Sequence, residues 1–226
     1  SSYTVVIKAI DSNGAQIQKE LQVSVNDTND DPSEIGLDNT SIAENTEVGT
    51  SIGSLNATDE DANDSHTFSL VTGSGDTDNV SFTREGGVIK AAESFNFETK
   101  SNYSIRVKAD DGNGGSLEQA LSITVTDAND SPTDIALSNA RVEHGEESGA
   151  EIGAFSTSDE DAEDEFTYEL VSGDGSTDNA SFTIEGAVLK AATTFNFNTQ
   201  AEYSIRVKST DSGSKSTEKA FTITVE

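Results

Sequence analysis

The sequence predicts an all-β chain of tandem Ig-like sandwiches, each with seven strands in Greek-key order. Two observations predict this fold. The chain repeats itself at a fixed offset of 100 residues, and its apolar residues come in short alternating runs separated by Gly, Asp and Asn. Alternation with period two is typical of strands that bury one face, and no stretch keeps a helical period for long.

The internal repeat sets the expected domains. The segment YSIRVKADDG from Tyr103 recurs as YSIRVKSTDS from Tyr203, and Tyr3 lies 100 residues before Tyr103. Two whole repeats and one partial repeat follow from this spacing. We expect a C-terminal hairpin of a truncated preceding repeat at 1–26, a linker at 27–32, a repeat at 33–126, a second linker at 127–132 and a repeat at 133–226.

The strands of one repeat can be followed in order. Short apolar runs at 50–58, 66–71, 80–85 and 87–92 lie about ten residues apart and are separated by turn residues. A longer hairpin ends the repeat, with apolar residues alternating on either side of the Gly-rich turn 111–115. Residues 1–26 hold only such a hairpin. A two-stranded hairpin is marginal alone, so we expect disorder or packing against another chain.

Charge and composition narrow the function classes. The chain has 42 acidic and 13 basic residues, a formal charge of -29, which excludes nucleic acid as a natural partner and favours cations. It has no Cys, which excludes disulfides, zinc–thiolate sites and thiol nucleophiles. No run approaches the roughly 18 apolar residues of a membrane span, so we expect no membrane insertion of this segment.

The acidic residues gather at turns and linkers. Two carboxylates about 4 Å apart repel by roughly 4 kcal/mol at an effective dielectric of 20, so convergent clusters call for a cation. Oxygen ligands without His or Cys select calcium. Solvated turns are the equally weighted alternative for any single cluster, because Asp and Asn are common turn residues. The clusters lie at 27–31, 59–64, 110–111, 127–130, 159–164 and Asp211.

Four motifs in order resemble the cadherin repeat, in the variant common in large bacterial surface proteins. The segment SIAENTEVGTSIGSLNATDEDA is similar to the cadherin opening, FNFET stands where cadherins have Leu-Asp-Arg-Glu, and DANDSP is similar to the Asp-x-Asn-Asp-Asn linker. The resemblance covers essentially the whole chain. It implies Ca²⁺ bound at the linkers and an extracellular or cell-surface location.

The resemblance also implies a ligand set at each linker. Two positions depart from it downstream, because His144 stands at the place of Glu44 and Asn198 at that of Glu98. Any joint after Glu226 is therefore expected to lack the near ions. The ligands implied at 127–132 are Glu44, Glu98, Asp127, Asn129, Asp130, Asp159, Asp161 and Asp211. Those implied at 27–32 are Asn29, Asp30, Asp59, Asp61 and Asp111.

An enzyme is not expected. The two histidines, His66 and His144, occupy unrelated repeat positions, and the paired carboxylates recur at linkers in both repeats. The expected function is a calcium-rigidified stalk or adhesion module of a bacterial surface or secreted protein, with calcium and like repeats on other cells as partners. The alternative is a carbohydrate-binding module that attaches to polysaccharide through the polar loops at 73–79 and 173–179.

Overall fold

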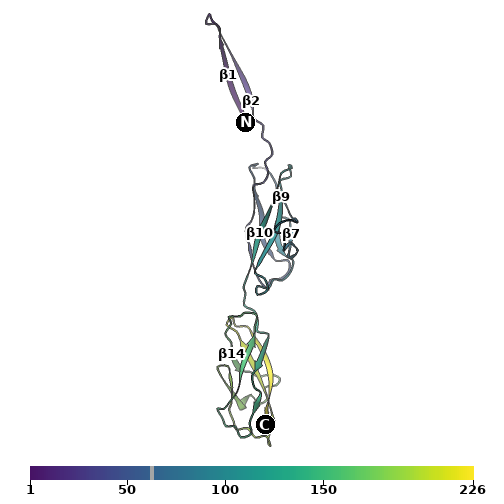
Figure 1. The fold of residues 1–226 in the computed structure, drawn as a ribbon, viewed down its shortest axis with the longest axis vertical. Helices are drawn as coiled ribbons and strands as arrows, with labels where there is room; N and C mark the ends of the chain where they lie inside the picture. The colour runs from purple at the N-terminus through teal and green to yellow at the C-terminus, as the bar shows by residue number, and fades with distance from the viewer. Residues whose placement is uncertain (62–63) are drawn as a thin grey trace. The chain divides into compact units, whose positions relative to one another are not determined.

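The computed structural model describes residues 1–61 and 64–226 and divides into two compact units, Ser1–Thr126 and Asp127–Glu226. Each unit contains one sandwich, and the first also contains the N-terminal hairpin (Figure 1). No α-helix occurs within the described ranges, where the helical elements are two short 3₁₀ turns. The predicted all-β tandem sandwich fold is confirmed.

The sandwich of the first unit has two four-stranded sheets. β4 pairs in parallel with β10, and the other neighbours pair antiparallel. A 3₁₀ turn, η1 (Asn79–Ser81), precedes β7. One sheet has the order β3 (Glu34–Leu37), β5 (Ser51–Thr58), β8 (Val88–Ala91) and β7 (Phe82–Glu85). The other has the order β4 (Ser41–Ala43), β10 (Ser116–Thr126), β9 (Asn102–Asp110) and β6 (Thr67–Leu70).

The edge strands β3 and β4 are two halves of one strand that changes sheets, which reconciles eight segments with the expected seven strands. The Asn39 side chain occupies the break between them. Its Nδ2 donates to the carbonyls of Ser41 at 2.8 Å and Ile52 at 2.7 Å. This side chain replaces the ladder hydrogen bonds that the break interrupts.

The second unit repeats this arrangement. β12 pairs in parallel with β18, as β4 does with β10, and η2 (Asn179–Ser181) precedes β15. One sheet has the order β11 (Asp134–Leu137), β13 (Glu151–Ser158), β16 (Val188–Ala191) and β15 (Phe182–Glu185). The other has the order β12 (Arg141–Val142), β18 (Ser216–Val225), β17 (Glu202–Thr210) and β14 (Thr167–Leu170).

Each sandwich encloses its own apolar core. The alternation expected in the last hairpin is observed, because Ile105, Val107 and Ala109 of β9 are fully buried and alternate with half-buried neighbours. An aromatic cluster closes one end of the core, where the Phe95 and Tyr103 rings meet edge to face with centroids 4.9 Å apart. Phe195 and Tyr203 repeat this contact at 4.9 Å in the second unit.

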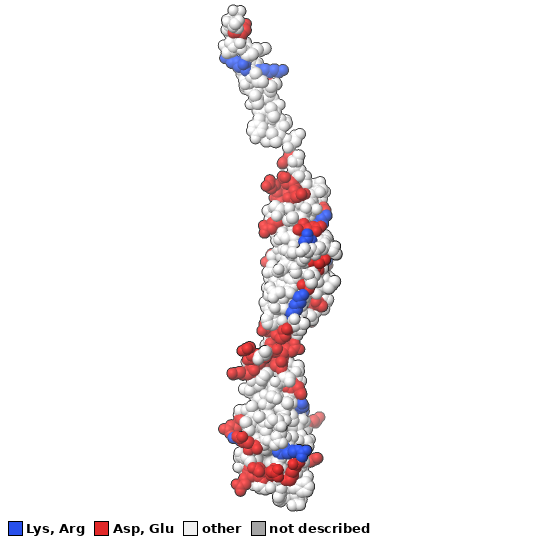
Figure 2. Space-filling view, viewed as in Figure 1, with Lys and Arg blue, Asp and Glu red and all other residues white. Residues whose placement is uncertain are grey.

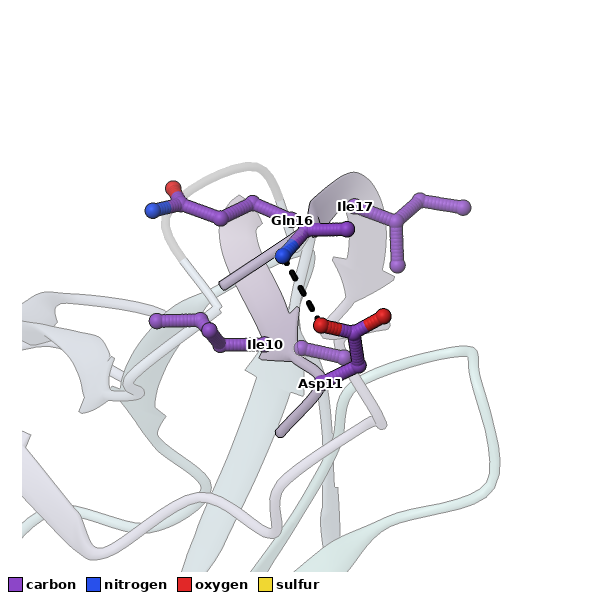
Figure 3. A pocket seen from close by; sticks show the side chains of 6 residues that line it. Ile10, Asp11, Gln16 and Ile17 are labelled. Atoms are coloured by element: carbon purple, nitrogen blue, oxygen red, sulfur yellow. Dashed lines mark hydrogen bonds between the residues drawn. The ribbon is translucent and has the colours of Figure 1, made fainter. Parts of the chain in front are cut away.

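The N-terminal hairpin pairs β1 (Ser2–Ile10) with β2 (Gln16–Ser24), and all of its residues are exposed. Asp11 holds the turn, because its Oδ1 accepts hydrogen bonds from Asn13 and Ala15 N–H groups at 2.9 and 2.8 Å. Beside this turn lies an open apolar pocket (Figure 3), where Ile10 and Ile17 are 58% and 70% exposed. The hairpin therefore presents an apolar face, unlike its counterparts β9–β10 and β17–β18.

Candidate metal centre

Carboxylates from separate parts of the sequence meet at one end of the first sandwich, which we call the linker end because the segment 27–32 lies against it. Figure 2 shows acidic side chains gathered there. The loop after β5 brings Asp59, Asp61 and Asp64, and the β9–β10 turn brings Asp111. The linker is tied to both: Asn29 Nδ2 donates to Asp111 Oδ2 at 2.9 Å, and Asp30 N–H donates to Asp61 Oδ2 at 2.7 Å.

Asp111 is fixed by its own turn. The carboxylate is buried, and its Oδ1 accepts the N–H groups of Asn113, Gly114 and Gly115 at 2.8–3.0 Å. The Asn29 side chain, together with these amides, outweighs desolvation and holds the pKa of Asp111 below its usual value. The group is therefore ionised at neutral pH and held in one orientation, as a metal ligand must be.

Hydrogen bonds also fix the carboxylate of Asp59, which lies in the loop after β5 at the same linker end. Its Oδ1 accepts the Asp61 N–H at 3.0 Å, and its Oδ2 lies 3.1 Å from His66 Nε2. The Asp61 amide, and after it His66, lower the pKa of Asp59 against the effect of burial. The side chain is only 3% exposed, so a buried anion is maintained by a few directed hydrogen bonds.

The second unit builds the same end from its own residues. Asn129 Nδ2 donates to Asp211 Oδ2 at 3.2 Å, and Asp130 N–H donates to Asp161 Oδ2 at 2.5 Å. Asp211 Oδ1 accepts the N–H of Lys215 at 2.7 Å. The linker segment of each unit thus binds its own sandwich through the same pair of contacts.

These ends fit a hard cation. Ligand oxygens of Asp59, Asp64 and Asp111 lie within 4.8 Å of one another, as do those of Asp159, Asp161 and Asp164. Two oxygens bound to one Ca²⁺ at 2.3–2.6 Å are at most about 5 Å apart. Among the residues that the structure describes, buried Oδ2 atoms of Asp64, Asp159 and Asp164 have no hydrogen-bond partner. Oxygen ligands, spacing and unsatisfied buried carboxylate atoms all suit calcium.

The opposite ends of the two sandwiches differ. Glu44 is 2% exposed, and its Oε2 accepts the Phe97 N–H at 2.7 Å. At the same place in the second unit, His144 is exposed and accepts the Phe197 N–H through Nδ1 at 3.2 Å. Glu98 is exposed in the first unit, and Asn198 takes its place in the second. Asp127 is an exposed residue that opens the second unit.

The sequence interpretation did not include two residues of these carboxylate clusters. Asp64 and Asp164 belong to acidic runs noted there, but they fall outside the ligand set implied by the resemblance. Their sole sequence signal is the recurrence of an Asp five residues after Asp59 and after Asp159. Only the folded loop shows that one oxygen of each carboxylate is buried without a hydrogen-bond partner among the described residues.

The polar loops considered for sugar binding are part of the scaffold. Asp78 Oδ2 accepts the Ser104 N–H at 2.8 Å. Asn79 donates to the Val71 carbonyl at 2.8 Å and accepts the Arg106 N–H at 2.9 Å. Asp178 and Asn179 repeat these contacts in the second unit. The amide and carboxyl groups most suited to a sugar are therefore used internally.

Comparison with known proteins agrees with this fold. Residues 38–126 match the family model described as Cadherin domain. Human Protocadherin gamma-A7 is 33% identical over 147 residues, which cover 60% of this chain and 16% of that protein. Mouse Protocadherin Fat 4 is 28% identical over 95% of this chain and 4% of that protein. The chain thus spans less than a fifth of these relatives.

Solved structures give the same result. The extracellular domain of protocadherin gamma B4 aligns with a TM-score of 0.66 and 26% identity, over 99% of this chain and 37% of that one. The human desmocollin-1 ectodomain aligns at 0.58 and 17% identity, over 100% and 48%. Along the described part of the chain, no helix has the length and apolarity to cross a bilayer. The location is extracellular or at the cell surface, as predicted, and the architecture is the tandem β-sandwich fold of cadherin repeats.

Proposed function

We propose that this chain is a calcium-binding segment of an extracellular protein, in which Ca²⁺ stiffens the connections between cadherin-like repeats. The observation that carries the proposal is the convergence of three carboxylates within 4.8 Å at the linker end of each sandwich. At an effective dielectric of 20, each pair at that distance repels by about 3.5 kcal/mol. A divalent cation removes that repulsion and satisfies the buried oxygens.

The proposed ligands are those implied by the resemblance. In each unit, residues of the linker contribute oxygens together with the loop after β5 or β13 and the turn of the last hairpin. The set at 27–32 is Asn29, Asp30, Asp59, Asp61 and Asp111. The set at 127–132 is Asp127, Asn129, Asp130, Asp159, Asp161 and Asp211, with Glu44 and Glu98 from the preceding repeat.

Calcium acts mechanically in this proposal. Without it, the carboxylates repel and the linkers flex; with it, ions restrain neighbouring repeats. Affinity in the range of about 10⁻⁴–10⁻³ M suits an extracellular module. We assign the chain a non-catalytic role as a stalk or adhesion segment whose partners are like repeats. Its placement on a bacterial surface stands on the sequence resemblance, whereas the relatives named above are animal proteins.

The hairpin 1–26 is proposed to complete a preceding repeat. Tyr3 and Val5 are 60% and 44% exposed, whereas the equivalent Tyr103 and Ile105 are 9% and 0% exposed. In the first sandwich, the opposing sheet covers those positions. The exposed face of the hairpin therefore carries the types of apolar residue that one sheet of a sandwich contributes to its core.

Calcium removal tests the function. We expect the full chain to unfold about 5–10 °C higher in 5 mM Ca²⁺ than in EDTA, since a Kd of about 0.5 mM gives roughly 1.4 kcal/mol of stabilisation. Differential scanning calorimetry measures the shift, and small-angle scattering reports whether the particle stiffens. An equal concentration of Mg²⁺ serves as the control, because its small octahedral shell fits this site poorly.

Identical calorimetry and scattering curves in Ca²⁺ and EDTA would refute the calcium proposal. The carboxylates would then be solvated turns. In that case a glycan array becomes the next measurement, because polysaccharide attachment is the remaining alternative.

A further inference from the structure

We propose that Asp64 and Asp164 are calcium ligands, each adding a carboxylate that the cadherin resemblance does not supply. This assignment rests on the calcium function proposed above and deepens it. It identifies which additional residue of each repeat binds the ion at the linker end.

In the first unit, the neighbouring turn orients Asp64. Its Oδ1 accepts a hydrogen bond from Asn113 Nδ2 at 2.8 Å. Asn113 is itself held by Asp111, whose Oδ1 accepts the Asn113 N–H at 2.8 Å. One oxygen of Asp64 is thus anchored to the turn that carries Asp111. The other, Oδ2, is buried without a hydrogen-bond partner among the described residues.

In the second unit, a different side chain produces the same orientation. The Ser212 hydroxyl donates to Asp164 Oδ1, and Ser212 follows Asp211 in the equivalent turn. Within the described segments, Asp164 Oδ2 is again buried without a hydrogen-bond partner, as is Asp159 Oδ2. Two unrelated anchors, an amide and a hydroxyl, therefore hold Oδ1, and in both units Oδ2 stays buried without a hydrogen-bond partner among the described residues.

A purely structural role does not explain this arrangement. A carboxylate that only ties two loops together needs one anchored oxygen and leaves the other in water. Burying an ionised oxygen without a partner costs several kcal/mol. Each of the two residues also has a carboxylate oxygen within 4.8 Å of oxygens from two further carboxylates, which adds repulsion. A bound cation gives the buried oxygen a partner and attracts all of the clustered carboxylates, so both unfavourable energies become favourable.

The additional carboxylate also bears on affinity. The charge and number of oxygen ligands tune calcium affinity over several orders of magnitude. With Asp64, the sandwich of the first unit supplies four carboxylates to its linker end, Asp59, Asp61, Asp64 and Asp111, in addition to those of the linker itself. Removing one negative ligand is therefore expected to weaken binding there by about tenfold or more.

The test uses the full chain and isothermal calcium titration of Asp64→Asn, Asp164→Asn and the double variant. Asn keeps an oxygen for the Asn113 or Ser212 hydrogen bond and removes the charge. Glu163→Gln is the matched control, because it removes the same charge from an exposed residue beside Asp164. Calorimetric melting of each variant in EDTA reports folding.

We expect each Asp→Asn variant to bind one ion at least tenfold more weakly and to melt higher than wild type in EDTA. Glu163→Gln should bind as wild type does. Wild-type affinity in both variants, or a lower melting temperature in EDTA with unchanged affinity, would overturn the ligand assignment alone. A wild-type chain that binds no calcium at all would instead overturn the proposed function.

Discussion

The two sandwiches share the same buried aromatic cluster and differ at their ends. Phe95 and Phe195 are 1% and 0% exposed, and Tyr103 and Tyr203 are each 9% exposed. At the end opposite the linker segment, Phe97 packs half-buried against the first core, whereas Phe197 is 53% exposed. Interiors are close-packed, so a change in one side chain requires changes in its neighbours. The ends carry no such constraint, and their chemistry can diverge while the fold is retained.

The linker ends diverge less than the opposite ends. His66, which lies 3.1 Å from Asp59, is replaced by Phe166, and Asn113 is replaced as the anchor by Ser212. The proposed ligands Asp59, Asp61, Asp64 and Asp111 all recur as Asp in the second unit. At the opposite end, the buried Glu44 becomes the exposed His144. Within one chain, the end proposed to bind calcium in both repeats is the one that keeps its proposed carboxylate ligands.

The largest expected effect tests whether the interiors match. Phe95→Ala and Phe195→Ala should each destabilise their own unit by about 3–5 kcal/mol, because each removes a fully buried ring. Hydrogen exchange by mass spectrometry, read on peptides of each unit, assigns the loss. Unequal losses that differ by more than about 2 kcal/mol would show that the cores are not equivalent.

A smaller and asymmetric effect tests the opposite ends. Glu44→Ala should destabilise the first unit by about 1–3 kcal/mol, because the Phe97 N–H loses its acceptor in a buried setting. His144→Ala should change the second unit by less than about 1 kcal/mol, since His144 is exposed. Urea unfolding in EDTA followed by the same exchange method measures both. Equal losses would contradict the difference in burial.

The smallest expected effect concerns pH. Burial raises the pKa of Asp78, but the Lys100 side chain and the Ser104 N–H outweigh it and hold that pKa below 3.8. A depressed carboxyl pKa stabilises the fold above the unfolded value, and this contribution is lost as the pH falls through the folded value. Lys100→Gln gives the first unit the residue that the second unit has at the equivalent position, Gln200. It should reduce the stability that the first unit loses below about pH 4 by up to about 1 kcal/mol.

Acid unfolding of the first unit, with Gln200→Lys as the reciprocal variant in the second unit, measures this effect. Gln200→Lys should steepen the acid dependence of the second unit. Parallel curves for wild type and Lys100→Gln would mean that the ion pair, which is partly exposed, is screened by solvent.

Much of this structure follows from local sequence pattern. Alternating apolar residues predict the strand that contains Ile105 and Val107, and the 100-residue offset predicts that the second unit repeats the first. Motif resemblance identifies Asp59, Asp61 and Asp111, which the fold brings to one end of the sandwich. Sequence spacing did not identify Asp64 or Asp164, because an Asp in an acidic turn has the same local pattern whether it faces solvent or a cation.

The sequence by itself determined the strand pattern, the repeat and the candidate oxygen ligands, because each depends on residue type and on short-range periodicity. The tertiary structure decided which polar groups are buried. Ser209 is fully buried against the Thr157 hydroxyl at 2.7 Å, in the place where the first unit has Ala109. The tertiary structure also decided that Oδ1 of Asp164 accepts a hydrogen bond from Ser212, whereas its Oδ2 is buried without a hydrogen-bond partner among the described residues. Both outcomes depend on contacts between residues about 50 positions apart, which no local pattern encodes.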